Sequence, residues 1–422
     1  MSWPQVNIMK SIIVLAVLSL AICASSQGTF DVDTDRPGTD IPGWRTANSP
    51  QDCQSQCRNT PNCKVWIYDS CGGPNAACWM KSEVNTGIMA KCRTSGVLDP
   101  RTSFRNPILP DKMADPWMLQ VGDWYYLTAT TGGDISLWRS RDLTNFYGAE
   151  RRSIWAPDRA GSNLKDLWAP EIHFIDGRLY CYFAADTDTQ LNDHKMYVLV
   201  NNGSDPFGDW SFAGKINTND DNWAIDGTVW NQGNGNLYFI WSGWENNILN
   251  FLQNLYIAKM CTGDPTKLCS PRTLLHRPLQ NWMRDGKSGV NEGPQILLNG
   301  NRTFLIYSAS SSWSSKYCLG MMGINSGDGD PLNAKNWWKF DDAPVMKGDN
   351  GVYGPGHCSF VKDRTGTDWI VYHANDLDLR GDIAWYSRTI RAESFRWNGD
   401  GSPWLPTPPR NIYQDINAPP LF

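Results

Sequence analysis

Five ionisable residues stand at the heads of strand-like segments that recur along the chain. They are Asp115, Glu171, Asp226, Glu292 and His357, and successive members lie 55 to 66 residues apart. The four carboxylic acids could hydrolyse a glycosidic bond, because one acid can protonate the leaving oxygen while a second, ionised, activates water or attacks directly. A third carboxylate beside the acid would raise its pKa, since neighbouring like charges disfavour ionisation. The chain therefore holds the groups that this hydrolysis needs, provided that the fold brings them together.

The repeat that contains these residues predicts such a fold. Each head leads into an apolar run, a turn of Gly, Asn or Asp, and an aromatic second strand, whereas helical patterns are weak. Repeats of short strands at this spacing are typical of a β-propeller, whose four-stranded blades place each innermost strand along a central axis. We therefore expect an all-β fold, a five-bladed β-propeller, with five polar heads at its axis. Packing alone would not explain acids there, because buried charges without partners are strongly unfavourable.

The composition limits the classes of partner. The chain has 422 residues, a formal net charge of −5, 22 Trp and only 19% charged residues. A domain that binds nucleic acid needs a clustered excess of Lys and Arg, so we expect no nucleic-acid partner. The length is sufficient for a large core and for a small second domain beside the propeller.

The amino-terminal residues resemble a secretory signal peptide. Lys10 precedes an apolar run, Ile12 to Ala24, and small residues follow it up to Ser26, so we assign residues 1–26 to this leader. The run is about 13 residues long, short of the roughly 20 that a spanning helix needs. We therefore expect a secreted, extracellular protein with no membrane partner. Sequons at Asn202 and Asn301 lie in turn-like segments and would be glycosylated in a eukaryotic secretory route.

Residues 28–97 form a separate, cysteine-rich segment. A segment of this size needs disulfides for stability, and its six cysteines allow fifteen pairings. Those cysteines are Cys53, Cys57, Cys63, Cys71, Cys78 and Cys92. We expect Cys261 and Cys269 to clip a loop or hairpin, and the odd total outside the leader requires at least one thiol free or intermolecular. The order of Pro-Gly-x-Asp, Cys-x3-Cys and Cys78-Trp79-Met80-Lys81 resembles the PAN/Apple modules, which implies either a binding module for protein or carbohydrate or a stapled spacer without a ligand.

The five heads lie in motifs that resemble the blade signatures of glycoside hydrolase family 43, over residues 105 to 410. The motifs are Met113-Ala114-Asp115-Pro116-Trp117, Leu167-Trp168-Ala169-Pro170-Glu171, Ala224-Ile225-Asp226-Gly227, Asn291-Glu292-Gly293-Pro294 and Tyr353-Gly354-Pro355-Gly356-His357. The resemblance implies a five-bladed propeller over residues 98–422 and hydrolysis with inversion of arabinofuranosides, xylosides or their polymers. It also implies roles: Asp115 as general base, Glu292 as general acid and Asp226 as modulator of the acid's pKa.

Further residues are expected to contact substrate. The resemblance implies pocket positions for Glu171, His357 and Arg388, with Arg380 as a competitor for the last; for Glu171, substrate contact and structural pairing are both open. Trp117 and Trp168 lie beside the proposed acids in sequence and could stack on sugar faces. The remaining histidines, His173, His194, His276 and His373, lie outside any motif and are expected at the surface or in packing. We expect no required cofactor and no catalytic metal; a largely hydrated calcium or sodium ion near the axis is a possible structural element.

Together with the leader, the resemblance implies a secreted, inverting glycosidase that removes L-arabinofuranosyl units from plant cell-wall arabinan or arabinoxylan. The ending Phe395 to Pro403 resembles family members with that activity, while β-xylosidase and endo-arabinanase are alternatives in the same family. A non-catalytic carbohydrate-binding propeller is a further alternative, but a binder has no need of an acid and a base. The Ser-x-Asp-x-Gly-x-x-Trp turns of sialidases and the Asn-Asp-Pro-Asn-Gly opening of invertases are missing from the sequence.

Overall fold

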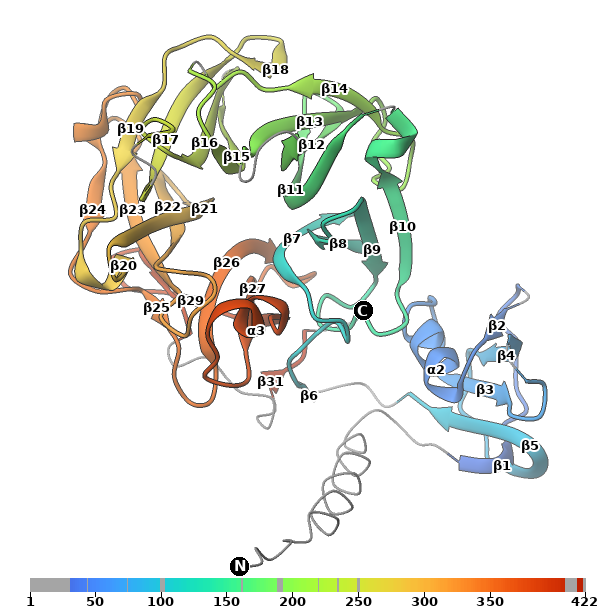
Figure 1. Cartoon of the computed structure of the whole chain (residues 1–422). Coiled ribbons are helices and arrows are strands. Elements are labelled where there is room, and N and C mark those ends of the chain that lie inside the picture. The colour runs from blue at the N-terminus through green and yellow to red at the C-terminus, as the bar shows by residue number, and fades with distance from the viewer. Residues whose placement is uncertain are drawn as a thin grey trace, which may run out of the picture. The chain divides into compact units, whose positions relative to one another are not determined.

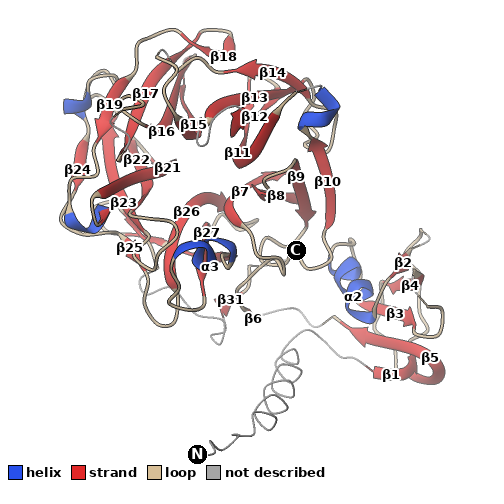
Figure 2. Ribbon diagram, viewed as in Figure 1, coloured by secondary structure: helices blue, strands red, loops and turns tan. Residues whose placement is uncertain are grey.

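A computed structural model describes residues 31–43, 45–73, 75–98, 103–160, 162–187, 193–218, 220–233, 235–248, 251–406 and 416–419. The expected signal peptide, residues 1–26, lies outside the described residues. The chain divides into two compact units, with the division between Phe104 and Arg105. Strands dominate both units and the helices are short (Figure 2). Among the described residues, none of the helices has the length and apolar character needed to cross a membrane.

From Asp31 to Val97, the described residues of the first unit form an antiparallel sheet of five strands with one helix. The strand order is β1-β5-β3-β4-β2, with bounds β1 Asp31–Asp35, β2 Thr46–Ala47, β3 Val65–Asp69, β4 Ala76–Lys81 and β5 Ile88–Val97. The helix α2, Pro50–Arg58, was not expected; it begins at Ser49, whose hydroxyl accepts a hydrogen bond from the Asp52 N–H at 3.1 Å.

Three disulfides cross-link this unit, and they correspond to one of the fifteen possible pairings of its six cysteines. Cys53–Cys78 joins α2 to β4, Cys57–Cys63 holds the end of α2, and Cys71–Cys92 links a turn to β5. The unit buries only a small core around Trp66, so these covalent links compensate for its limited apolar surface.

The second unit is a ring of five blades (Figure 1). Blade 1 contains β7 Ala114–Val121, β8 Trp124–Thr130, β9 Ile135–Ser140 and β10 Glu150–Trp155; blade 2 contains β11 Leu164–Ile175, β12 Arg178–Thr187, β13 Lys195–Asn201 and β14 Ser211–Lys215. Blade 3 contains β15 Ala224–Gly233, β16 Asn236–Gly243, β17 Leu252–Cys261, β18 Asp264–Leu268 and β19 Thr273–His276. Blade 4 contains β20 Arg284–Asp285, β21 Ser288–Asn299, β22 Arg302–Ala309, β23 Cys318–Asn325, β24 Trp338–Phe340 and β25 Met346–Lys347. Blade 5 contains β26 Tyr353–Lys362, β27 Asp368–Asn375 and β28 Thr389–Ser394.

The remaining elements are short connections. They are β6 Ser103–Phe104, the 3₁₀ turns Pro157–Ala160, Asn281–Met283 and Ala334–Asn336, the helix α3 Gly381–Tyr386, and β29 Arg396–Trp397, β30 Pro403–Trp404 and β31 Ile416–Asn417. The expected closing strand near Trp397 is the hairpin of β29 and β30.

The first residues of the propeller unit close the ring against its last blade. The Ile108 N–H donates to the Ile390 carbonyl at 2.9 Å, and the Asn106 side chain bonds to the backbone N–H and C=O of Ala392 in β28. A segment before blade 1 thus supplies an outer partner for blade 5. Closure of this kind protects the edge of the last sheet.

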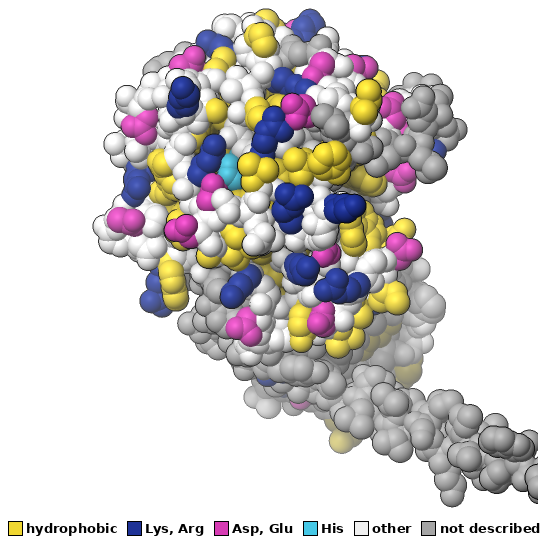
Figure 3. Space-filling view, turned by 60° about the vertical axis from the view of Figure 1, so that its left-hand side comes forward, with side chains coloured by type: hydrophobic (Ala, Val, Ile, Leu, Met, Phe, Trp, Pro, Cys, Tyr) yellow, Lys and Arg dark blue, Asp and Glu magenta, His cyan; other side chains and the backbone are white. Residues whose placement is uncertain are grey.

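The blades do not all have the four strands that the repeat predicts. Blade 5 has a three-stranded sheet, and blades 3 and 4 are joined into one sheet by a short parallel pairing of β17 with β21. Aromatic clusters fill the spaces between neighbouring blades, as where Tyr182 of blade 2 meets Phe239 of blade 3 with ring centroids 5.5 Å apart. Cys261 and Cys269 are paired as expected, and of the described cysteines Cys181, Cys318 and Cys358 are free and buried. On the face shown in Figure 3, basic and acidic side chains are interspersed rather than gathered by sign.

Candidate active site

The innermost strands of the blades open with backbone irregularities that set the direction of the polar heads. Each of β7, β11, β15, β21 and β26 has a register shift against its neighbour at the head residue or directly next to it. Three heads adopt a left-handed backbone, with φ of 59° at Asp115, 55° at Asp226 and 44° at His357. Such conformations are unfavourable for residues with a side chain, and bulges of this kind re-aim side chains next to active sites. The repeated strain indicates a functional centre.

The backbone conformation and close packing at position 293 explain why glycine follows Glu292. The φ of Gly293 is +52°, and a Cβ built there would lie 3.2 Å from Cγ of His357, closer than nearly all real contacts. Its N–H donates to Asp226 Oδ2 at 3.0 Å. The glycine therefore lets the backbone after Glu292 approach both Asp226 and His357.

Asp115 is buried among positive and hydrogen-bonding groups. Its Oδ2 accepts from Thr130 Oγ1 at 2.7 Å, and its Oδ1 lies 3.2 Å from His357 Nδ1, 3.3 Å from His373 Nδ1 and 3.5 Å from Arg388 Nη1. Burial alone would raise the pKa of this carboxyl, but His357, Arg388 and His373 outweigh it and hold the pKa well below its ordinary value. Asp115 is therefore a carboxylate at neutral pH.

The pKa values of Glu292 and Asp226 are shifted in the opposite direction, upward. Burial raises the pKa of Glu292 to about 7, against the hydrogen bond that Tyr317 donates to Oε1 at 2.7 Å, and the charge of Asp115 acts in the same direction as burial. Burial and the neighbouring charges of Glu292 and Asp115 raise the pKa of Asp226 well above its ordinary value. Both carboxyls resist ionisation, so the pair retains a proton near neutral pH.

Glu171, His357 and Arg388 also lie in this part of the propeller. Glu171 accepts from Gln295 Nε2, and its other oxygen is 2.9 Å from His173 Nε2, so both oxygens are occupied. His357 reaches Asp226 as well as Asp115, with Nδ1 3.8 Å from Asp226 Oδ2, and burial lowers the pKa of its imidazole. Arg388 is buried with Nη1 3.5 Å from Asp115 Oδ1, whereas the competing Arg380 is exposed.

Three tryptophans form an aromatic wall next to Arg388, and we call Trp168, Trp313 and Trp385 the Trp wall. The Arg388 guanidinium lies 4.0 Å from the ring centroid of Trp385, which is 6.0 Å from the ring of Trp168 and 6.4 Å from that of Trp313. Trp385 lies in α3, and the Gly381 N–H at the start of α3 donates to the Trp313 carbonyl at 2.8 Å. Trp313 is 40% exposed, so the wall extends from the buried Arg388 to solvent.

Trp117 does not join the acid cluster, although it was expected to stack on a sugar beside Asp115. Its indole N–H donates to the Ile172 carbonyl at 3.0 Å, and its ring packs on His173 with centroids 4.6 Å apart. It lines a different cavity of about 210 Å³, together with residues such as Val229 and Ile296.

Sequence reasoning missed His373 and Tyr317. His373 is not merely a packing residue: its Nδ1 accepts from the Asp115 N–H at 3.1 Å, its ring stacks on Tyr317, and burial lowers its pKa to about 4. His373 lies directly across from Gly356 in the paired strand, so its proximity to His357 was a possible signal. Among the described residues, no group of three or more His, Cys, Asp or Glu side chains is placed to hold a metal ion.

Comparisons with known proteins agree with this architecture. Residues 104–403 match the model of glycosyl hydrolases family 43, and residues 34–81 match that of the PAN domain. The chain is 37% identical over 313 residues to an extracellular exo-α-(1→5)-L-arabinofuranosidase of Streptomyces avermitilis, covering 72% of this chain and 63% of that protein. It is 31% identical over 329 residues to α-L-arabinofuranosidase 43 of Humicola insolens, covering 76% of this chain and 66% of the relative. The crystal structure of an α-L-arabinofuranosidase from Lactobacillus brevis superposes with a TM-score of 0.67 at 32% identity, covering 74% of this chain and 98% of that one. The chain thus spans somewhat less than two thirds of the length of these two curated relatives.

Proposed function

The chain belongs to glycosyl hydrolases family 43, and we propose that it is a secreted α-L-arabinofuranosidase that acts with inversion. The names of its relatives support the arabinofuranosyl specificity, and the Streptomyces avermitilis relative is named as extracellular. The substrate that we propose is plant cell-wall arabinan or arabinoxylan.

The observation that carries the proposal is the opposite tuning of two buried carboxyls in one cluster. The pKa of Asp115 is held well below its ordinary value and that of Glu292 is raised to about 7, so one is ionised while the other keeps a proton. Pairs of carboxyls whose environments separate their pKa values are the usual sign of a base and an acid.

The reaction needs one water and no cofactor. Asp115 takes a proton from the water as the water oxygen forms a bond to the anomeric carbon. Glu292 gives its proton to the glycosidic oxygen as the bond from that oxygen to the anomeric carbon breaks, and the product has the opposite anomeric configuration. Burial and the charge of Asp115 keep the pKa of Glu292 high, and Asp226, which binds the Gly293 N–H next to Glu292, is assigned as the modulator of that pKa. A hydrated calcium or sodium ion near the axis stays a prediction, and no step is assigned to it.

In this proposal the other residues of the site contact the sugar or hold the catalytic carboxyls in place. Arg388 and His357 hold Asp115 ionised, and Glu171, with both oxygens engaged, shapes the pocket without transferring protons. Trp168 offers its ring to the sugar, as part of the Trp wall. Trp117 is not assigned to this sugar site because it lines the other cavity.

The test compares Glu292→Gln and Asp115→Asn with Glu245→Gln, a change at an exposed residue. We expect both cluster variants to lose at least about a hundredfold in kcat/KM on α-1,5-linked arabinotriose, in line with the loss of a general acid or base. Glu245→Gln should match the wild type. Near-normal activity of either cluster variant would refute the roles, and a preference of the wild type for aryl xylosides over aryl arabinofuranosides would refute the specificity.

A further inference from the structure

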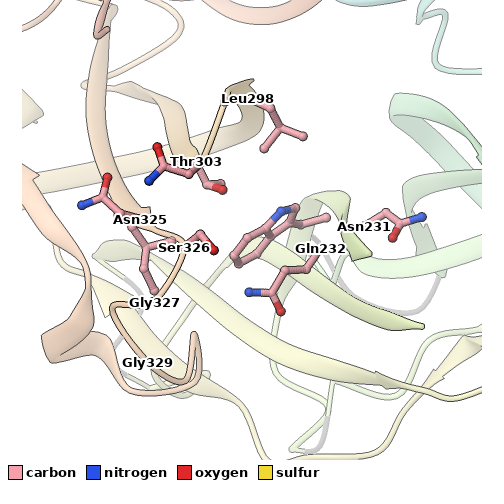
Figure 4. Close-up of a pocket in the computed structure, with 12 residues that line it drawn as sticks. Asn231, Gln232, Leu298, Thr303, Asn325, Ser326, Gly327 and Gly329 are labelled. Atoms are coloured by element: carbon pink, nitrogen blue, oxygen red, sulfur yellow. The ribbon is translucent and has the colours of Figure 1, made fainter. Parts of the chain in front are cut away.

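A second concave site lies between blades 3 and 4, and we call it the amide groove. Its volume is about 390 Å³, and Figure 4 shows Gln232 of blade 3 on one side of it and Asn325 and Ser326 of blade 4 on the other. The lining residues are Trp230, Asn231, Gln232, Leu298, Gly300, Asn301, Thr303, Ile324, Asn325, Ser326, Gly327 and Gly329. This volume is in the range of small-ligand sites.

The amide groove is separate from the acid cluster. Asp226 and Asn231 lie on the same strand, β15, five residues apart, and Glu292 and Leu298 lie on β21, six residues apart. At about 3.3 Å per residue these separations are roughly 17 to 20 Å. A sugar bound at the acids therefore cannot also fill the amide groove.

The chemistry of the lining selects a neutral, hydroxyl-rich ligand. None of the described residues that line the groove is charged. The side-chain amides of Gln232, Asn301 and Asn325 make no hydrogen bond to another described residue, so each keeps a donor and an acceptor for a ligand. Leu298 is 54% exposed and supplies apolar surface beside them. Amides next to an apolar surface match the hydroxyls and C–H faces of a sugar.

The groove also adjoins the cavity that Trp117 lines. The two cavities share Trp230, Asn231 and Leu298, and the second adds about 210 Å³. A ligand longer than one sugar residue thus has room to extend.

We propose that the amide groove binds a neutral pentose oligosaccharide segment of the polymeric substrate, as a second site remote from the hydrolysed bond. The identity of the polymer rests on the proposed function. Binding at two sites on one chain raises the local concentration of polymer without changing the chemical step. The groove therefore increases activity on arabinan and leaves activity on small substrates unchanged.

The test uses the whole protein made in a bacterial periplasm, so that Asn301 carries no N-glycan. Hydrogen exchange followed by mass spectrometry is recorded for Glu292→Gln, which prevents hydrolysis, with and without linear α-1,5-arabino-oligosaccharides. We expect slower exchange in residues 298–303 and 324–329 as well as near the acids. Polygalacturonate, which is anionic, should not protect these segments, because the groove offers it no cation. Exchange that changes only near the acids would overturn the proposal.

A matched pair of variants separates this proposal from the proposed function. Gln232→Ala combined with Asn325→Ala removes two ligand hydrogen bonds and should weaken retention on arabinan gels about tenfold. The control Gln280→Ala removes an exposed amide outside the groove and should have no effect. Both should keep wild-type kcat/KM on an aryl arabinofuranoside. Unchanged retention in the double variant would overturn the second site even if hydrolysis is normal, whereas protein that cleaves no arabinofuranoside would refute the proposed function alone.

Discussion

Replacement of Tyr317 by phenylalanine should raise the pKa of the proposed acid. The Tyr317 hydroxyl donates to Glu292 Oε1 at 2.7 Å, and this bond lowers the pKa of Glu292 because it favours the ionised form. A hydrogen bond to a charged group contributes about 1.5 kcal/mol or more, and one pKa unit corresponds to about 1.4 kcal/mol. The pKa of Glu292, about 7 in the wild type, should therefore rise by about one unit.

The assay is the pH dependence of kcat/KM on α-1,5-linked arabinobiose. Glu292 must hold its proton to act as the acid, so activity falls as the pH rises through its pKa, and this alkaline limb reports the free enzyme. In Tyr317→Phe the limb should move to higher pH by about one unit. The phenyl ring retains the stacking on His373.

Tyr307→Phe is the matched control for this measurement. Tyr307 is on the same blade and fully buried, but its hydroxyl has no hydrogen-bond partner in the part of the chain that the structure describes. Its alkaline limb should coincide with that of the wild type. A limb that stays in place in Tyr317→Phe, or moves to lower pH, would refute the reasoning about Glu292.

Three further predictions follow from the same contacts. Arg388→Met removes a cation 3.5 Å from Asp115, so the pKa of Asp115 should rise and the acidic limb of kcat/KM should move to higher pH; an unmoved limb counts against this role. Gly293→Ala should lower both Tm and kcat, because φ is +52° and the new Cβ would meet His357 at 3.2 Å; wild-type values would contradict the packing. Folded Glu292 binds its proton more tightly than the unfolded group, with a pKa of about 7 against an ordinary 4.5, so wild-type stability should fall between pH 4.5 and 7. Glu292→Gln should remove this pH dependence, which amounts to about 3 kcal/mol in the free energy of unfolding. Denaturant titrations across this pH range test it, and equal pH dependence in the wild type and Glu292→Gln would show that the pKa of Glu292 is not raised.

The sequence was sufficient for the repeat and for the heads of the inner strands. A propeller repeats one structural unit, so residues in equivalent positions of the unit meet at the axis wherever the ring closes. Asp115, Asp226 and Glu292 follow this rule. His373 and Tyr317 come from a second strand and a connecting segment, and no repeat position marks them, so only the folded packing reveals their contacts with the acids.

The expected position of Trp117 beside Asp115 was wrong because the strand is irregular there. Residues two apart on a regular strand share a face, which would place Trp117 beside Asp115. The register shift between Ala114 and Trp117, with the left-handed backbone at Asp115, breaks this alternation. Such a bulge depends on neighbouring blades, and local sequence does not specify it.

The sequence analysis did not predict the helix α2 or the strand pairing that joins blades 3 and 4, for different reasons. Ser49, Pro50 and Asp52 form a helix-start signal that is present in the sequence, but the segment is short and its cysteine spacing is the more prominent pattern. The parallel pairing of β17 with β21 involves residues Leu252 and Gly289, which are far apart in the chain, and no local pattern predicts it.

In the proposed reaction Asp115 directs a water at the anomeric carbon while Glu292 protonates the leaving group on the other side. Proton NMR of the first product formed from an aryl α-L-arabinofuranoside tests this most directly, because it observes the anomeric proton before mutarotation. We expect β-L-arabinofuranose first, followed by slow equilibration. Initial appearance of the α-anomer would contradict it, because retention requires a covalent intermediate on a carboxylate in place of a water activated by Asp115.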